Sequence, residues 1–106
     1  MEPFVPSTTN NAINPPVNTV NTQTAFPVLA NALTTASGWS MRVYNPGGNM
    51  VAIETGPTGT VASLTTSLLI PPGGVEVFGL RGTDTEIATI AAVAGTALNV
   101  TFGQGV

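Results

Sequence analysis

The sequence contains no cysteine, no histidine and no lysine. Without cysteine and histidine, the usual ligand sets of zinc, haem and iron-sulfur clusters cannot be assembled, and no disulfide framework forms. A nucleophilic triad also lacks its usual base, because one of these three residue types supplies it in most such sites. The sequence therefore predicts a protein that is not an enzyme and that binds no cofactor.

Charged residues are scarce as well: they make up 7% of the 106 residues, against ~25% in a typical soluble protein. Arg42 and Arg81 are the only basic side chains, and the formal net charge is -3. Because nucleic-acid binding depends on neutralising phosphates, we expect no nucleic-acid partner. Surface charge normally opposes the association of copies, and this chain carries few charges. We therefore expect a homo-oligomer, either a dimer or a trimer.

Long apolar runs are also missing. No stretch approaches the ~18 apolar residues of a membrane span, and the first residues have neither a basic start nor a continuous apolar segment. We therefore expect neither a membrane partner nor a signal peptide. A chain of this length has room for one domain, whose small core predicts modest stability.

Two segments have the composition of a strand, a turn and a second strand. In residues 68–80, a Pro-Pro-Gly-Gly sequence at 71–74 separates two apolar runs. Proline presets φ for the first half of a turn and glycine supplies positive φ for the second half. Residues 41–53 repeat this order around Asn-Pro-Gly-Gly-Asn at 45–49. We expect a hairpin-like unit at each position.

The other segments complete a β pattern. Residues 39–44 and 97–102 alternate apolar and polar side chains, as half-buried strands do. Residues 86–93 are compatible with helix or strand, and we assign a strand; residues 24–33 fit a first strand, although part of them would tolerate a helical turn. Six or seven short strands predict an all-β fold, a small antiparallel β-sandwich of jelly-roll-like or Ig-like type.

A set of apolar positions is expected to lie between the two sheets. Alternation places Val75 and Val77 on the buried face of their strand, with Glu76 on the solvent face. The full expected core consists of Trp39, Met41, Val43, Ile53, Val75, Val77, Ile87, Leu98, Val100 and Phe102.

Residues 1–23 differ from residues 24–106, which form the sandwich domain. They are rich in Asn, Thr and Pro, and their prolines favour an extended N-terminal arm. Such a segment cannot build its own core, so it is either a disordered tail or an arm that lies across another subunit. We expect the second, with four apolar side chains spaced to enter pockets on a partner. These partner-binding residues are Phe4, Val5, Ile13 and Val17.

The acidic residues allow two kinds of site, and each has a structural alternative. Glu54, Glu76 or Glu86 could supply a carboxylate pair for glycoside hydrolysis, but about 80 residues of sandwich seldom provide the cleft this needs. Asp84 and Glu86 could contribute oxygens to calcium, although an Asp that caps its own turn is the stronger interpretation. We therefore expect no catalytic residue and no metal site.

The residues from about position 40 onward resemble small β-sandwich virion proteins of tailed bacteriophages, the capsid decoration or cement proteins and related head-fibre modules. The resemblance rests on the order of three segments: residues 41–54, residues 69–78 and residues 87–105. It covers about two thirds of the chain and carries no catalytic motif; the N-terminal arm departs from the simplest members.

The resemblance implies a mechanical role on the outer capsid, with the major capsid protein as partner and the virion surface as location. The alternative is a receptor- or carbohydrate-binding module of a head or tail fibre. That alternative requires an exposed aromatic platform, for which Trp39 and Tyr44 are the available residues.

Overall fold

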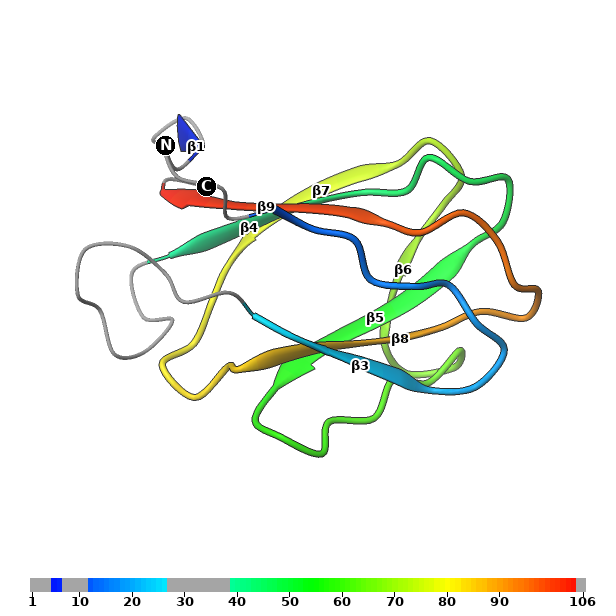
Figure 1. Ribbon diagram of the computed structural model, residues 1–106, viewed down its shortest axis with the longest axis horizontal. Helices are drawn as coiled ribbons and strands as arrows, with labels where there is room; N and C mark the ends of the chain where they lie inside the picture. Colours follow the sequence, from blue (N-terminus) through cyan, green and yellow to red (C-terminus); the bar gives the residue numbers. More distant parts are fainter. Residues whose placement is uncertain (1–4, 7–11, 27–38, 105–106) are drawn as a thin grey trace.

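The computed structural model describes residues 5–6, 12–26 and 39–104, and within these residues all regular structure is β-strand. Figure 1 shows the strands in two layers that face each other. The prediction of an all-β fold built as a small antiparallel β-sandwich is therefore confirmed. The part of the chain that the structure describes contains no helix long and apolar enough to cross a membrane.

The first sheet is the upper layer in Figure 1. Its strand order is β1-β9-β4-β7, and β2 also pairs with β9. The bounds are β1 Val5–Pro6, β2 Ala12–Ile13, β4 Ser40–Tyr44, β7 Val75–Gly79 and β9 Asn99–Gln104. Every pairing in this sheet is antiparallel, and β7 is its last strand on one side.

The second sheet is the lower layer, with the order β3-β8-β5-β6. The bounds are β3 Thr22–Ala25, β5 Val51–Gly56, β6 Leu68–Ile70 and β8 Glu86–Ile90. All pairings are again antiparallel. The expected strand within residues 86–93 is thus present as β8, while residues 27–38, which include most of the expected first strand, lie outside the described residues.

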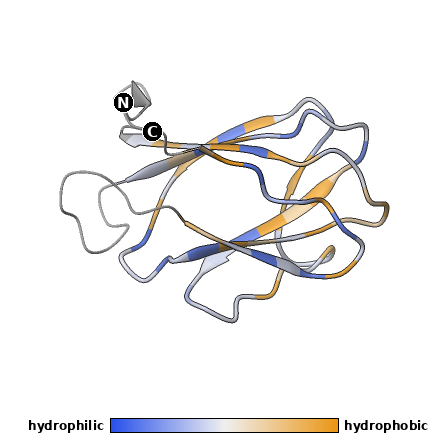
Figure 2. Ribbon diagram, viewed as in Figure 1, coloured by the Kyte–Doolittle hydropathy of each residue, from blue (hydrophilic) through white to orange (hydrophobic). Residues whose placement is uncertain are grey.

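The core lies between the two sheets and follows the alternation of the strands. In the first sheet, Met41 and Val43 of β4 stand beside Phe102 and Val100 of β9, and all four are buried. Figure 2 shows hydrophobic positions on strands of both layers, interspersed with hydrophilic ones. Of the ten expected core residues, eight are buried: Trp39, Met41, Val43, Ile53, Ile87, Leu98, Val100 and Phe102.

The prediction for β7 was wrong because its two faces are exchanged. Met41 pairs with Phe78, so Phe78 is on the inner face and packs against the core. Val75 and Val77 are therefore on the outer face of the first sheet, where Val75 is 45% exposed and Val77 is half-buried. Glu76 is on the inner side but remains exposed, because β7 is an edge strand.

Both Pro-Gly turns connect strands of different sheets, which corrects the expectation of hairpins. The β6–β7 turn carries the chain from the second sheet to the first, and residues 45–50 carry it from β4 to β5. The turn residues behave as expected: Gly74 N donates to Pro71 O at 2.8 Å, and Gly73 has φ of 73°. Pro72 and Gly73 thus occupy the central positions of a type II turn.

Residues 12–26 belong to the sandwich, which corrects the expectation of an arm over this part of residues 1–23. Ile13 of β2 pairs with Val100 and packs against the core, and Val17 is a core residue that is 4% exposed. The backbone of Val17 also bridges to Gly95. The proline-rich composition prevents helix, but it does not prevent short strands and buried valine.

A long loop, residues 57–67, covers part of the outer face of the second sheet. Asn21 and Gln23 donate to Thr60 O at 3.3 and 2.7 Å, and Ala62 N donates to Asn21 Oδ1 at 2.8 Å. Ala52 and Ala88 are on this outer face and are nevertheless fully buried. The loop thus acts as a partial third layer.

Candidate partner-binding surface

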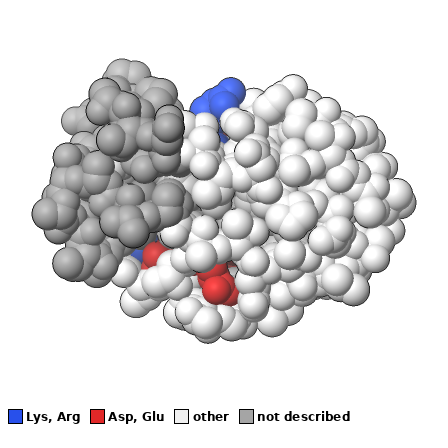
Figure 3. Space-filling view, viewed as in Figure 1, with Lys and Arg blue, Asp and Glu red and all other residues white. Residues whose placement is uncertain are grey.

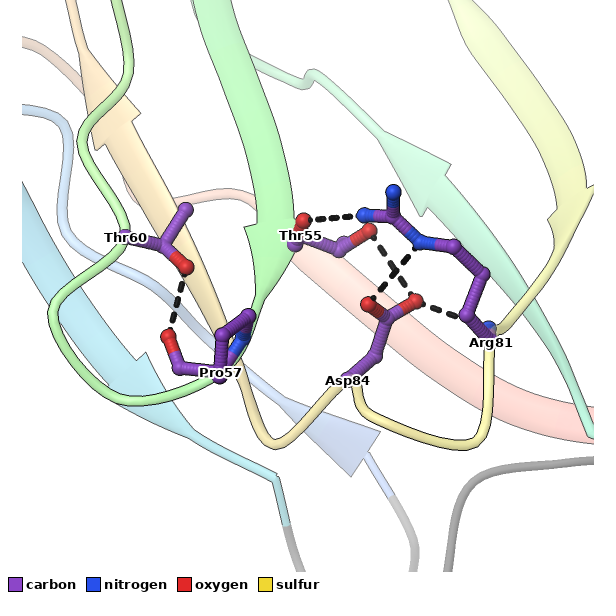
Figure 4. A network of polar contacts seen from close by, with 5 residues as sticks. All are labelled: Thr55, Pro57, Thr60, Arg81 and Asp84. Carbon is purple, nitrogen blue, oxygen red and sulfur yellow. Dashed lines mark hydrogen bonds and ion pairs between the residues drawn. The ribbon is translucent and has the colours of Figure 1, made fainter.

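The side chain of Asp84, in the turn before β8, makes bonds within the chain (Figure 4). Asp84 is 3% exposed; its carboxylate accepts from Arg81 N at 2.8 Å and from Arg81 Nε at 3.2 Å. Thr55 Oγ1 lies 3.4 Å from the same carboxylate, and Arg81 also donates to Thr55 O at 2.7 Å. The interpretation that Asp84 caps its own turn is confirmed, since Asp84 N also donates to Arg81 O.

Glu86 binds the covering loop rather than a ligand. It is 7% exposed, and its Oε2 accepts from Gly59 N and Thr60 N, both at 3.1 Å. Gly59 has φ of 97°, a conformation that suits glycine, and it brings its N–H toward the carboxylate. Glu86 therefore anchors residues 57–60 on the second sheet.

The remaining carboxylates of the described strands are not assembled with these two. Glu54 accepts from Ser67 Oγ at 2.9 Å, and Glu76 is exposed on the edge strand β7. Within residues 5–6, 12–26 and 39–104, no three His, Cys, Asp or Glu side chains are placed to hold a metal ion. The geometry thus assigns structural bonds to Glu54, Asp84 and Glu86.

The two aromatic residues that could stack on a sugar, Trp39 and Tyr44, do not form an exposed platform. Trp39 is 2% exposed and belongs to the core, although its Nε1 has no hydrogen-bond partner in the described structure. Tyr44 is half-buried on the outer face of the first sheet. A stacking surface needs exposed ring faces, which Trp39 does not offer.

The four residues expected to bind a partner have different positions. Ile13 and Val17 contact the chain's own core, which corrects their expected role. Val5 is in β1, whose backbone pairs with β9, and its partner-binding role stays a prediction. Phe4 lies outside the described residues.

Exposed apolar side chains occur in β6 and in the segments before β5 and β6, and we call three of them the outer patch: Met50, Leu64 and Leu69. Their exposed fractions are 46%, 40% and 39%. Leu69 pairs with Ala52, so its side chain is on the outer face, and Met50 directly precedes β5. Leu64 is in the covering loop, four residues before β6 begins.

The sequence contains a signal for exposed apolar surface at β6 that strand alternation alone does not show. Leu68, Leu69 and Ile70 are three consecutive apolar residues in one strand. Because neighbouring side chains of a strand point to opposite faces, they cannot all enter the core. Ile70 is fully buried, whereas Leu68 and Leu69 are exposed.

A small pocket of about 150 Å³ opens between the edge strands of the two sheets. It is lined by Ile53, Glu54, Thr55, Leu68 and Phe78. Leu68 comes from β6 and Phe78 from β7, so the two edges lie close together on this side of the sandwich. The pocket is too small for the drug-sized ligands that sites of roughly 300 Å³ or more accept.

The described surface carries few charges. Figure 3 shows one face of the molecule, on which acidic and basic side chains form only small, isolated areas. A comparison with protein-family models finds no match, and a comparison with curated proteins finds no similar sequence.

Proposed function

We propose that this protein is a structural virion protein, a decoration or cement protein that binds the outer surface of a phage capsid. The outer patch is the observation that carries the proposal. Met50, Leu64 and Leu69 expose aliphatic surface, and exposed apolar surface is the kind that another protein covers on binding. The partner in this proposal is the major capsid protein, and the virion surface is the location.

The construction of the domain suits a mechanical role. Its acidic side chains fasten turns and loops, as Glu86 does for residues 57–60 and Asp84 for residues 81–84. A sandwich fastened in this way changes shape little on binding, so less free energy is lost to ordering. The protein also functions as a homo-oligomer in this proposal, because its core is small and its surface charge low.

The alternative function, a receptor- or carbohydrate-binding module of a fibre, gains no support from the aromatic residues. Trp39 is buried in the core, and Tyr44 is half-buried. A buried Trp39 removes one of the two aromatic residues from which the platform of a sugar-binding module could be built. We therefore keep the capsid role as the single proposed function.

Binding to phage heads that lack their decoration protein tests this proposal. The variant Met50→Ser/Leu69→Ser should fold normally, because both side chains are exposed. It should occupy at least about tenfold fewer sites, since two half-exposed side chains would lose ~1 kcal/mol of apolar burial each. Occupancy is measured by sedimenting heads with the purified protein and quantifying the bound fraction.

The matched control is Val20→Ser. Val20 is 66% exposed and leads into β3, at the edge of the second sheet opposite β6. Its replacement should leave occupancy unchanged. Failure of the parent protein to bind such heads, or equal loss in both variants, would contradict the proposed function.

A further inference from the structure

One edge of the first sheet presents unused backbone groups. In the described residues, β7 pairs with β4 on one side and has no strand on its other side. Leu80 N donates to Trp39 O at 2.9 Å, and Asn45 N donates to Gly74 O at 3.0 Å. These two bonds determine which residues of β7 are hydrogen-bonded to β4. Because antiparallel pairs alternate between bonded and non-bonded positions, every second residue of β7 directs its backbone toward β4.

The other residues of β7, which alternate with those bonded to β4, direct their backbone N–H and C=O groups away from β4. By this alternation, the N–H and C=O groups of three residues point to the open side: Val75, Val77 and Gly79. An edge of this kind is a template for pairing with another strand unless a charged side chain, proline or a bulge protects it. The one charge on this edge is Glu76, which restricts the possible registers. Residues 75–79 contain no lysine and no proline.

We propose that the open edge of β7 pairs with β7 of a second copy, antiparallel and centred on Val77, so that two first sheets form one continuous sheet. In this register, Val77 is opposite the partner's Val77, and Val75 is opposite the partner's Gly79. The three residues whose backbone points outward on one chain are therefore paired with the same three residues of the second chain, in the opposite order. Each opposed pair exchanges two N–H···O bonds, so every unused backbone group of this edge finds a partner.

Glu76 decides between this register and its neighbour. Centring the pair on Glu76 would place two carboxylates directly opposite each other at a non-hydrogen-bonded position, with Cα atoms ~4.5 Å apart. Like charges opposite each other destabilise a strand pair. The register centred on Val77 instead places Glu76 opposite the partner's Phe78, with the two Glu76 residues shifted by ~7 Å along the strands.

The same arrangement covers apolar surface on the second sheet. The two-fold axis of such a pair is perpendicular to the joined sheet, so both second sheets lie on one side and their β6 edges face each other. Leu68, 46% exposed beside the pocket between β6 and β7, is thereby brought toward the partner's Leu68. Leu69 of the outer patch points to the other face of the second sheet and stays available.

The strength of this dimer follows from its size. A five-residue strand pair with one flanking apolar contact buries less than the ~1,600 Å² of a standard interface. We therefore expect a dimer that dissociates on dilution. This inference rests on the homo-oligomer part of the proposed function and is independent of the capsid as partner.

Single cysteines test the register, because the parent sequence has none. With Val77→Cys, the two Cα atoms in the proposed dimer are ~5.5 Å apart, which is within the range of a disulfide. With Val75→Cys, the two positions are ~14 Å apart along the strands. Mild oxidation followed by a non-reducing gel should show a covalent dimer for Val77→Cys at least tenfold more abundant than for Val75→Cys.

The Val75→Cys variant is a demanding control, because Val75 is the more exposed of the two residues. Random collisions would therefore cross-link it at least as readily as Val77→Cys. Equal cross-linking of the two variants, or faster cross-linking of Glu76→Cys, would overturn the proposed register.

Sedimentation over a concentration series tests the pairing itself. The Val77→Pro variant removes an N–H that points away from β4, and proline is tolerated at such positions of edge strands. It should be monomeric where the parent and Val77→Thr are dimeric, with an unfolding midpoint close to theirs. A parent that stays monomeric at every concentration, or a Val77→Pro variant that dimerises like the parent, would overturn the inference; if Val77→Pro unfolds, the cross-linking result decides.

These outcomes separate the dimer from the capsid role. A protein that cross-links through Val77→Cys but does not bind heads keeps the β7 pairing and loses the proposed function. A protein that is monomeric but binds heads keeps the proposed function and loses the β7 pairing.

Discussion

At the scale of single residues, the two valines Val100 and Val75 test the assignment of the faces. Val100 is fully buried between the sheets, whereas Val75 is 45% exposed on the outer face of β7. Val100→Asp places an unpaired carboxylate in the core and should unfold the domain. Val75→Asp should melt within a few degrees of the parent, as followed by circular dichroism. Similar melting of both variants would show that one of the faces is wrongly assigned.

The carboxylate of Glu86 supports a second residue-scale prediction. Glu86→Ala removes the acceptor of the Gly59 and Thr60 N–H groups, so we expect a loss of about 2 to 3 kcal/mol in urea unfolding. Glu86→Gln keeps one acceptor oxygen and should lose less. The control Glu76→Ala, at an exposed edge position, should change stability little. A loss for Glu76→Ala as large as that for Glu86→Ala would mean that the loop bonds are not the cause.

The residues of β7 also show why sequence alone assigned its faces wrongly. Val75, Glu76 and Val77 alternate as a half-buried strand does, and this pattern places the valines inside. The face is set instead by the pairing of Phe78 with Met41 across the sheet. Alternation predicts which residues share a face but not which face is buried, and at an edge strand both faces tolerate valine.

At the scale of elements, the segment before β3 should be essential for the fold. A chain that begins at Thr22 lacks β1 and β2, the core residue Val17 and the contact of Ile13 with the core. We expect its thermal midpoint to fall by at least ~10 °C, because ~1 kcal/mol shifts a domain of this size by 4–8 °C.

A chain that begins at Ala12 is the matched control, since it keeps β2, Ile13 and Val17. Its midpoint should fall clearly less. If the chain beginning at Thr22 has the same thermal midpoint as the parent, residues 12–21 contribute nothing to the stability of the fold. Residues 1–23 would then be a separate arm.

The turns show how far local sequence reaches at this scale. The Pro-Pro-Gly-Gly sequence correctly predicted a turn with positive φ at Gly73. It did not indicate whether the chain returns beside the same strand or crosses to the other sheet, because φ and ψ of four residues fix a change of direction but not the partner strand. β6 pairs with β5 and β7 pairs with β4, and these long-range pairings are set by the core as a whole.

At the scale of the whole molecule, composition predicted the class of protein better than its binding surface. The alternating short segments and the Pro-Gly turns between them correctly indicated a small all-β sandwich. The Leu68-Leu69-Ile70 run indicated that apolar surface would stay exposed at β6, but the exposure of Met50 and Leu64 became known only from the folded chain. The same holds for the open edge of β7, which becomes an edge only because no described strand follows it in the sheet.

Electron cryomicroscopy of the native phage particle tests the capsid role most directly. We predict density for the two-layered sandwich at repeated positions on the outside of the head, with Met50, Leu64 and Leu69 facing the major capsid protein. Density for this fold only at the tip of a fibre, or a decorated head in which the outer patch faces solvent, would contradict the account.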